Sequence, residues 1–155
     1  MSKHTLLSPL TGRVVPLAEV PDEAFSSGML GQGFAVEPSR TCDGTVCAPA
    51  DGVVETVADA RHAYTIHTDD GLDLLVHIGI DTVSLAAHPF AALVSPGDRV
   101  KAGQPIARAD LPVIRAAELP TVTPVVITNP DTLRDLSPVF GDVEGGESIA
   151  ARYSL

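Results

Sequence analysis

Two histidines in neighbouring apolar segments are the residues of this chain with the clearest chemical potential. His77 lies in the middle of LLVHIGIDTV, residues 74–83, and Asp81 follows it in an H-x-x-x-D spacing. His62 opens the preceding segment, HAYTIHT. A lone histidine in an apolar strand is commonly a hydrogen-bonded core residue, so chemistry is indicated only if the two imidazoles come together.

The sequence between the two histidines predicts a tight hairpin that brings them together. The dipeptide DG at 70–71 is a strong signal for a two-residue type I′ turn. With the turn placed there, Tyr64 pairs with His77 and His62 pairs with Gly79, so the two histidines become diagonal neighbours on one face. A shift of the register by one residue would separate them, and the inference therefore depends on the turn.

Alternation along the two strands divides their side chains between two faces of the sheet. One face of the second strand is apolar and is expected to be core: Leu74, Val76, Ile78 and Ile80. The other face is expected to hold Leu75, His77, Gly79 and Asp81, together with His62, Tyr64 and Ile66 from the first strand. Gly79 should leave a space opposite His62 and beside His77 in which a small anion could bind.

Two imidazoles, a carboxylate and a space are compatible with three functions. In a phosphoryl carrier, a neutral ring nitrogen of one histidine attacks phosphorus while the other ring stabilises the developing charge by a hydrogen bond. In a zinc-binding β-domain, His62, His77 and Asp81 would be the ligands, although the chain lacks the H-x-H pair of the peptidases that have this H-x-x-x-D spacing. In the third case the two histidines have no chemical function and only satisfy each other's hydrogen-bonding groups. The hairpin alone does not distinguish this case from the phosphoryl carrier.

A carrier of a different kind is indicated by PGDRVKAGQPIA, residues 96–107. This segment is similar to the turn-and-strand repeat of biotinyl and lipoyl carrier domains, which bear their cofactor on a lysine at the tip of an exposed hairpin. Lys101 is the only lysine outside the N-terminal segment, but it lacks the methionine or aspartate neighbour usual in those domains. A biotinyl or lipoyl carrier remains an alternative function.

Short apolar segments separated by glycine and proline must position these residues. The chain has 13 glycines and 13 prolines spread along it, which is typical of an all-β antiparallel sandwich or barrel. We expect short helical turns at 21–29 and 111–119 and strands at 12–16, 33–37, 44–48, 52–58, 63–68, 72–80, 99–100 with 105–109, and 123–128. The apolar rhythm fades from Leu136, so we expect one domain over 1–155 that ends in a loosely held tail, 136–155.

The composition indicates which classes of partner and which cellular compartment to expect. A formal net charge of −10 argues against nucleic acid and anionic lipid and favours a basic protein surface as partner. No apolar run is long enough to span a bilayer and the N-terminus lacks the pattern of a secretory signal, so we expect a soluble, cytoplasmic protein without membrane insertion. Cys42 and Cys47 have no second cysteine pair, and we expect reduced thiols rather than zinc ligands.

The order and spacing of six segments resemble the glucose-type IIA component of the bacterial phosphoenolpyruvate-dependent sugar phosphotransferase system. These segments are SPLTGRVVPLAEVPDEAF, GMLGQGFAVEP, APADGVVETV, HAYTIHTDDGLDLLVHIGIDTV, GDRVKAGQPIA and TPVVITN. The similarity covers about residues 6–131, and HAYTI combined with LLVHIGIDTV matches both histidines and their separation. The resemblance implies an antiparallel β-sandwich and a phosphotransferase that forms a phosphohistidine and needs no cofactor.

The resemblance also implies a role for individual residues. His77 matches the histidine that accepts a phosphoryl group on Nε2 from the histidine phosphocarrier protein and passes it to a cysteine of a IIB domain, for coupled sugar uptake. His62 matches the second histidine, which hydrogen-bonds the phosphoryl group and is needed mainly for onward transfer. The partner-binding residues are expected to be Asp22 and Asp81, which would meet an arginine of the phosphocarrier protein, together with Phe25 and Gly79.

One position departs from the family pattern. Ala60 stands where family members commonly have a threonine whose hydroxyl orients the first histidine, so we expect weaker control of transfer to the IIB domain than of acceptance from the phosphocarrier. The resemblance further implies possible regulatory targets. The chemistry of two imidazoles also allows adventitious zinc at His62 and His77, with a further ligand from a partner or a crystal neighbour. The identity of the transported sugar cannot be read from the sequence of a IIA component. Because the sequence shows no adjoining linker, we expect a free-standing carrier.

Overall fold

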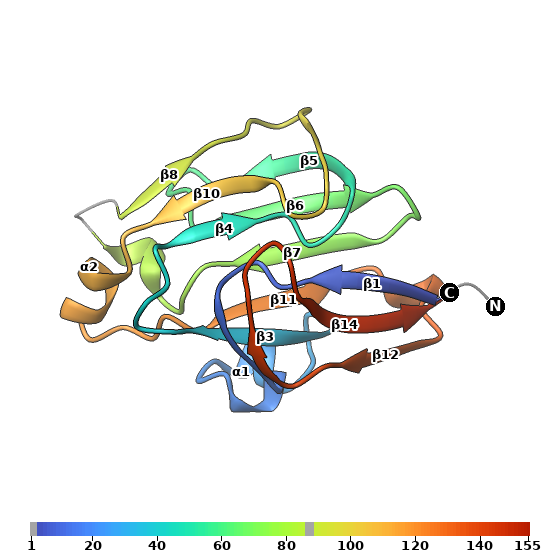
Figure 1. Cartoon of the computed structure of the whole chain (residues 1–155), viewed down its shortest axis with the longest axis horizontal. Helices are drawn as coiled ribbons and strands as arrows, with labels where there is room; N and C mark the ends of the chain where they lie inside the picture. The colour runs from blue at the N-terminus through green and yellow to red at the C-terminus, as the bar shows by residue number, and fades with distance from the viewer. Residues whose placement is uncertain (1–2, 86–88) are drawn as a thin grey trace.

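The computed structural model describes residues 3–85 and 89–155 of the chain, which form an antiparallel β-sandwich (Figure 1). One sheet has eight strands in the order β13-β2-β3-β11-β7-β6-β5-β9, and two sheets have three strands each, β1-β14-β12 and β4-β10-β8. Side chains from all three sheets pack into one core. The expected fold class, all-β with short helical turns, is confirmed.

The strands are short and the helices are shorter than two turns. The strands are β1 Lys3–Leu7, β2 Gly12–Val15, β3 Gln32–Pro38, β4 Thr45–Cys47, β5 Gly52–Val57, β6 Ala63–Thr68, β7 Asp73–His77, β8 Phe90–Ala92, β9 Arg99–Val100, β10 Pro105–Ala109, β11 Thr123–Ile127, β12 Asp135–Pro138, β13 Gly141–Val143 and β14 Ile149–Ser154. The helical turns are η1 Leu17–Glu19, α1 Glu23–Ser26, η2 Thr82–Ser84, α2 Leu111–Ala116 and η3 Pro130–Thr132. Within the described ranges, none of these helices has the length and apolar character needed to cross a bilayer.

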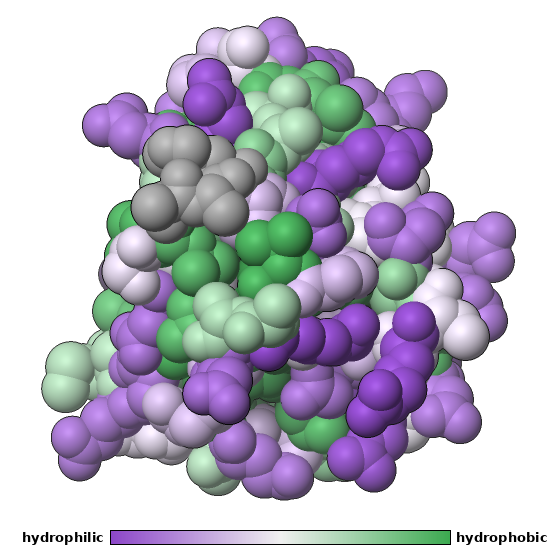
Figure 2. Space-filling model, turned by 90° about the vertical axis from the view of Figure 1, so that its left-hand side faces the viewer, coloured by the Kyte–Doolittle hydropathy of each residue, from purple (hydrophilic) through white to green (hydrophobic). Residues whose placement is uncertain are grey.

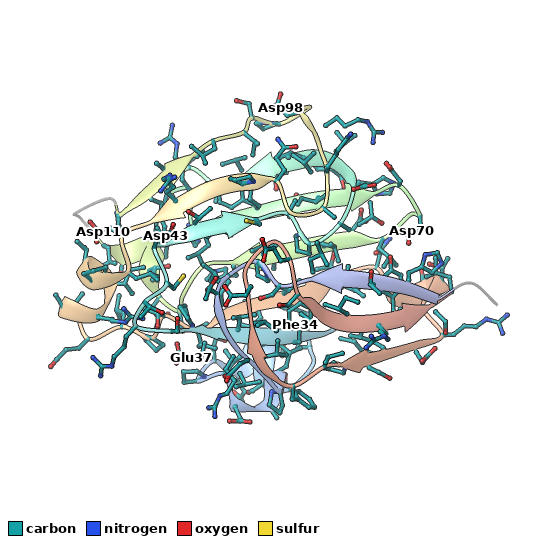
Figure 3. The ribbon with its side chains drawn as sticks, in the orientation of Figure 1. Phe34, Glu37, Asp43, Asp70, Asp98 and Asp110 are labelled. Atoms are coloured by element: carbon teal, nitrogen blue, oxygen red, sulfur yellow. The ribbon has the colours of Figure 1, made fainter. Side chains whose placement is uncertain are left out.

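Alternating burial along the strands identifies the core face. In β6 and β7 the fully buried side chains are Tyr64, Ile66, Leu74 and Val76. Full burial of a side chain of this size contributes about 1.5–3 kcal/mol, so these positions fix the register of the two strands. Figure 3 shows the same division in the whole molecule, because Phe34 lies between the sheets while Asp98 lies at the periphery.

The hairpin between β6 and β7 has a three-residue loop at 69–71, so the expected two-residue turn is wrong. The Thr68 amide donates to the Leu72 carbonyl at 2.8 Å, and the Gly71 amide donates to the Thr68 carbonyl at 3.0 Å. Gly71 has a φ of 95°, the left-handed conformation that closes a loop of this length.

The longer loop shifts the pairing of the strands by one residue. Ala63 pairs with His77 and Tyr64 with Val76, whereas the sequence interpretation paired Tyr64 with His77. Tyr64 and Ile66 therefore belong to the core, not to the face that carries His77. An Asp-Gly step is compatible with both loop lengths, and the burial of these two large side chains selects the longer one.

The C-terminal segment is not a loosely held tail, because it forms three strands. β14 lies between β1 and β12 in one of the three-stranded sheets, with Lys3 paired to Ser154 and Asp135 also paired to Ser154. Ala150 and Ala151 are fully buried, and Tyr153 is 3% exposed. The sequence hides this strand because its buried positions are small alanines, which give a weak apolar pattern.

A second, smaller apolar cluster lies on the outer face of the large sheet, near the end of β7. Its buried members are Val15, Val20, Phe25, Ala35, Ile80, Val122 and Val126. The helical turn α1 contributes Phe25 to it, and Figure 1 shows α1 beside β3 on the outside of the sandwich. This cluster shields part of a face that would otherwise be open to water.

Candidate functional site

The imidazoles of His62 and His77 meet at the end of the β6–β7 hairpin that is remote from its loop. Their ring centroids lie 5.0 Å apart and the ring planes are nearly perpendicular, at 88°. Both side chains are half-buried. A phosphate-sized group bound to one ring would therefore be within reach of the other.

Strand alternation does not explain why the rings of His62 and His77 lie together. In the observed register, strict alternation would place His62 and His77 on opposite faces. His62 instead lies just before β6, where the chain turns through Arg61 with a φ of 63°, and its carbonyl accepts a hydrogen bond from the Ile78 amide at 2.7 Å. The expectation that the two rings lie together thus matches the geometry, but the turn from which it was derived was wrong.

The backbone at Gly79 fixes the tautomer of His77. Nδ1 of His77 lies 2.7 Å from the Gly79 carbonyl oxygen, and a carbonyl only accepts, so Nδ1 carries the proton and donates it. The lone pair of the neutral ring is then on Nε2. A neutral imidazole with its lone pair on the free nitrogen is a nucleophile.

Gly79 acts through this carbonyl and not through a space beside the histidines. Its φ is 72°, and a Cβ on it would lie 2.6 Å from Cγ2 of Thr82 and 2.9 Å from the Pro120 carbonyl oxygen. The anion-sized space expected next to His77 at this residue is therefore not formed. The sequence signal that could have indicated the true role is the glycine two positions after a histidine, where the chain leaves a strand.

Burial favours the neutral form of both imidazoles. Burial lowers the pKa of His77, and the Gly79 carbonyl and the carboxylates of Asp22 and Asp81 oppose this to a smaller extent. Burial also lowers the pKa of His62, and the neighbouring His77 adds to the effect. Neutrality of the attacking ring is what phosphoryl acceptance requires.

Two acidic residues border the pair from different segments. The Asp22 carboxylate caps α1 by accepting a hydrogen bond from the Ala24 amide at 2.9 Å, as is common for a residue preceding a helix. Asp81 is exposed, has a φ of 60° and precedes η2. Both carboxylates act to raise the pKa of His77, against the larger effect of burial.

Phe25 packs beneath the site, and its expected contact with a partner remains a prediction. Its ring centroid lies 5.3 Å from that of His77, and the side chain is only 4% exposed. Phe25 is the buried residue of α1 and packs in the smaller apolar cluster, because the helix turns this position toward the sheet. It holds and desolvates the His77 ring.

Two features of His62 were not predicted. Its ring lies 6.4 Å from that of Phe90 in β8, between centroids, which places a segment distant in sequence against the site. Its Nδ1 is buried and has no hydrogen-bond partner among the described residues. Ala60 supplies no hydroxyl, so the ring is oriented by packing alone in this part of the chain.

The segments that carry Phe25 and Asp81 also carry exposed apolar residues. Met29 and Leu30 follow α1 and are 77% and 36% exposed, and Val83 in η2 is 60% exposed. Figure 2 faces this end of the molecule and shows apolar residues gathered in and around a hollow, with hydrophilic residues at its border. Exposed apolar side chains beside carboxylates are typical of a docking surface for a protein with a basic rim.

The alternative functions find less support in the geometry. Within residues 3–85 and 89–155 the one group of three mutually close metal-ligating atoms is Glu55, His67 and Asp73, so Asp81 does not complete a zinc site with the histidine pair. Lys101 lies between β9 and β10, which belong to different sheets and do not pair with each other. It is therefore not at the tip of a carrier hairpin. His88, for which the sequence AAHPF predicts a surface or packing role, lies outside the described residues.

Comparisons with known proteins identify the family of the chain. The model of the family "phosphoenolpyruvate-dependent sugar phosphotransferase system, EIIA 1" matches residues 4–133. The chain is 37% identical, over 93% of its length and 86% of the relative's, to a "PTS system glucose-specific EIIA component" of Oceanobacillus iheyensis. Its fold is similar to that of glucose permease IIA from Mycoplasma capricolum, with a TM-score of 0.85, 32% identity and coverage of 98% and 96% of the two chains.

Other relatives are much longer proteins. The chain is 41% identical over 90% of its length to a "PTS system mannose-specific EIIBCA component" of Corynebacterium glutamicum, of which it covers 19%. It is 41% identical over 97% of its length to a "PTS system beta-glucoside-specific EIIBCA component" of Bacillus subtilis, of which it covers 24%. The chain thus spans about a fifth to a quarter of these relatives. On the extent of the family match and of the similarity to the IIA relatives, the chain belongs to the EIIA 1 family of the phosphoenolpyruvate-dependent sugar phosphotransferase system.

Proposed function

We propose that this glucose-type IIA component carries a phosphoryl group on Nε2 of His77, accepting it from the histidine phosphocarrier protein and passing it to a cysteine of a IIB domain. The observation that carries the proposal is the hydrogen bond from Nδ1 of His77 to the Gly79 carbonyl, which leaves Nε2 as the free nucleophile beside His62. The chain acts in this way as a phosphotransferase with a phosphohistidine intermediate.

The transfer is an exchange of one P–N bond for another. The lone pair on Nε2 of His77 attacks phosphorus while the bond from phosphorus to the donor's histidine nitrogen breaks and its electron pair returns to the donor ring. Nδ1–H of His77 stays bonded to the Gly79 carbonyl, whose dipole stabilises the positive charge that the phosphorylated ring acquires. No proton has to leave His77 during the step.

His62 is suited to hold the phosphoryl oxygens. Because no acceptor is within reach of its buried Nδ1 among the described residues, the proton of the neutral ring is better placed on Nε2. An Nε2–H group can donate to a phosphoryl oxygen and spread the charge of the transition state. His62 would then matter most when the group leaves His77 for the IIB thiolate.

Asp22 and Asp81 are suited to partner recognition and not to binding the phosphoryl group, which they would repel. On a chain with a net charge of −10, they would attract the basic rim of the phosphocarrier protein and orient an arginine toward the site. That arginine would also neutralise phosphoryl charge during transfer. A function that depends on phosphoenolpyruvate and on these partners would be a cytoplasmic one.

A IIB domain as acceptor is supported by the printed names of the longer relatives, in which a region similar to this chain belongs to an EIIBCA component. The names specify mannose, β-glucoside and glucose, so the sugar differs among proteins with similar IIA regions. The sugar served by this chain is therefore a property of its transporter.

Intact mass after incubation with phosphoenolpyruvate, enzyme I and the histidine phosphocarrier protein tests the proposal. The wild type should gain a single acid-labile phosphoryl group, which is absent in His77→Ala and retained in His62→Ala. His67→Ala is the matched control, because His67 lies on the same strand pair but away from the site. Transfer from phosphorylated His62→Ala to a IIB domain should be slow. A His77→Ala protein that is phosphorylated like the wild type contradicts the proposal.

A further inference from the structure

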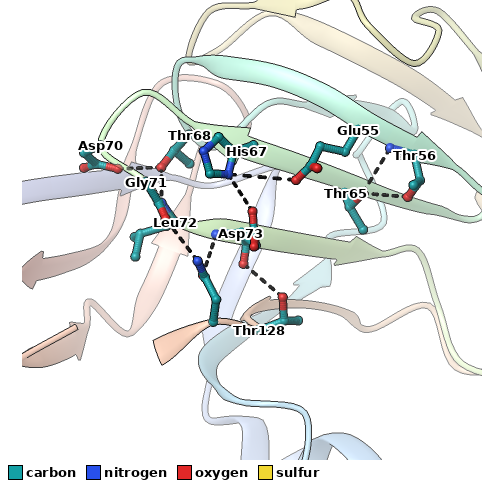
Figure 4. A network of polar contacts seen from close by, with 11 residues as sticks. Glu55, Thr56, Thr65, His67, Thr68, Asp70, Gly71, Leu72, Asp73 and Thr128 are labelled. Atoms are coloured by element: carbon teal, nitrogen blue, oxygen red, sulfur yellow. Dashed lines mark hydrogen bonds and ion pairs between the residues drawn. The ribbon is translucent and has the colours of Figure 1, made fainter. Parts of the chain in front are cut away.

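Three metal-ligating side chains gather on the outer face of the large sheet, apart from the histidine pair. They are Glu55 on β5, His67 on β6 and Asp73 on β7, and one ligand atom from each lies within 4.8 Å of the others (Figure 4). β7 is 5 residues long and carries Asp73 and His77 at its two ends. With a rise of about 3.3 Å per residue, the cluster lies about 13 Å from His77 along the strand.

The sheet register brings these residues together. His67 pairs directly with Asp73 across β6 and β7, so their side chains share a face. On the other side, β5 has a bulge between Val54 and Thr56, where the register shifts. Glu55 is the additional residue of this bulge, and a bulge of this kind commonly re-aims a side chain.

The bulge puts two consecutive side chains on the outer face. Thr56 pairs with Thr65, and their hydroxyls are hydrogen-bonded at 2.6 Å. Glu55 turns toward His67 instead, with its Oε1 at 3.9 Å from Nδ1. A regular strand would not present both Glu55 and Thr56 to this face.

The ligand atoms are close to the separations found in a metal's coordination sphere. Nδ1 of His67 lies 2.7 Å from Oδ1 of Asp73 and 3.9 Å from Oε1 of Glu55. With metal–ligand bonds of about 2.0–2.2 Å, ligand atoms of a tetrahedral zinc site lie about 3.3 Å apart. Each of the two distances differs from this value by about 0.6 Å, which small rotations of exposed side chains can supply.

The backbone that carries the cluster is held in place. The Asp73 amide donates to Oδ1 of Asn129 at 2.6 Å, and the Asp73 carbonyl accepts from the Thr128 amide at 2.9 Å. Asn129 also donates through Nδ2 to the Gly71 carbonyl at 3.0 Å, which ties the hairpin loop to the end of β11. A site on a fixed sheet needs little reordering to bind an ion.

Two carboxylates with one imidazole form a donor set with net negative charge. Within the described part of the chain, the ion pairs of Glu55 and Asp73 are with His67 alone, and neither carboxylate faces a lysine or arginine. The side chains of His67, Glu55 and Asp73 are 52%, 50% and 36% exposed, so an ion and its remaining waters could reach them. An imidazole favours a first-row transition ion over Mg²⁺ or Ca²⁺.

From this geometry we propose that Glu55, His67 and Asp73 bind a divalent transition-metal ion of the zinc class. Nδ1 of His67, one oxygen of Glu55 and one oxygen of Asp73 are the protein ligands, and water takes the open position. The proton that Nδ1 shares with Asp73 passes to solvent if the ring is protonated and moves to Nε2 through water if the ring is neutral. Nδ1 then gives its lone pair to the ion, whose charge the two carboxylates neutralise. The ion joins three adjacent strands and stabilises the folded chain against unfolding.

Isothermal titration with Zn²⁺ at pH 7.5 tests this site in the His62→Ala/His77→Ala double variant, from which the other histidine pair has been removed. One saturable site is expected. Adding His67→Ala should abolish it, and Glu55→Gln and Asp73→Asn should each weaken it by at least about tenfold. His4→Ala is the matched control, because His4 has a single carboxylate neighbour, Asp70, at 3.4 Å.

A second readout locates the ion independently of affinity. Co²⁺ added to ¹⁵N-labelled double variant should broaden or shift amide signals at 55, 67 and 73 and leave those at 62 and 77 much less affected. The thermal midpoint should rise with Zn²⁺ in the double variant and stay constant once His67 is also replaced. Zn²⁺ binding that survives His67→Ala, or no Zn²⁺ binding in the double variant, would overturn the proposal, and neither result bears on phosphorylation of the wild type.

Discussion

The two ends of the β6–β7 hairpin carry histidines whose pKa values are shifted in opposite directions. At one end, burial lowers the pKa of His77, although Asp22 and Asp81 are near it. At the other end, the hydrogen bond to Asp73 raises the pKa of His67, which is exposed to solvent. The same side chain on the same strand pair is thus shifted toward its neutral form where the sheet is covered and toward its protonated form where the sheet is open.

The difference between the two histidines comes from Phe25 and the helical turn α1, which cover the sheet at His77, and not from the sheet itself. Both histidines have carboxylates nearby, and only His77 is packed against an aromatic ring and a helical turn. Desolvation outweighs the carboxylates at His77, and a direct hydrogen bond outweighs desolvation at His67. Predictions that remove the cover, the backbone carbonyl or the charge difference therefore test this account.

Removing the cover should have the largest effect. Phe25→Ala deletes a buried ring from a small apolar cluster, and we expect the free energy of unfolding to fall by about 3 kcal/mol in chemical denaturation. The pKa of His77, followed by NMR, should rise toward its ordinary value because its main cause of lowering is burial. Phe140→Ala, at a side chain that is 57% exposed, is the control and should change neither quantity. An unchanged His77 pKa in Phe25→Ala would show that the ring does not desolvate the histidine.

Disturbing the carbonyl that fixes the tautomer should have the next largest effect. Gly79→Ala introduces a Cβ into a left-handed position against Thr82 and Pro120, which should cost about 1–3 kcal/mol of stability. Initial rates of phosphorylation should fall as well, since the carbonyl that accepts from Nδ1 of His77 must move. Gly97→Ala is the matched control, because Gly97 has a φ of 95° and open space around it. Equal phosphorylation rates in the two variants would contradict the role given to the Gly79 carbonyl.

The charge difference predicts opposite pH dependences for the two ends. For His62 and His77 the folded pKa is lower than the unfolded value, so the unfolded chain binds more protons and stability should fall as the pH drops below about 6.5. For His67 the folded pKa is raised, so its contribution is complete below about 6.5 and is lost as the pH rises through the folded pKa. NMR titration of the imidazole signals should find His67 titrating above the other two, and the reverse order would refute the comparison.

A small effect is expected from restoring a hydroxyl near His62. Ala60→Thr would offer a partner to the buried Nδ1 of His62, a hydrogen bond worth about 0.5–1.5 kcal/mol. We expect transfer from the phosphorylated protein to a IIB domain to become a few times faster, with acceptance from the phosphocarrier protein unchanged, in rapid-quench kinetics. Ala60→Val, which is similar in shape but has no hydroxyl, should leave both rates as they are. A gain in Ala60→Val would assign the effect to packing.

Several features of the fold follow from local chemistry and could be predicted. Glycine and proline between short apolar segments indicated the all-β class, and the two histidines stood out by type and position. The register could not be derived, because the Asp-Gly step fits two loop lengths and only the burial of Tyr64 and Ile66 decides between them. The C-terminal strand could not be predicted, because its buried residues Ala150 and Ala151 are small and give only a weak apolar pattern.

The site was less predictable than the fold because its contacts join distant segments. Phe25 reaches His77 from α1, and Phe90 reaches His62 from β8, and no local pattern connects these positions. The role of Gly79 depends on a left-handed backbone and a carbonyl direction, which the sequence expresses only as a glycine. The cluster around His67 depends on a bulge, which a period-2 pattern does not reveal.

The pairing of β1 with β14 has a consequence for how this chain can be joined to other domains. Lys3 lies beside Ser154, and both ends of the described chain emerge together near the hairpin loop, at the end of the sandwich opposite His77 (Figure 1). A tether attached at either terminus would leave the histidine face uncovered. Because the two ends lie together, a linker of a given length would give a fused domain the same reach to the histidine face from either terminus.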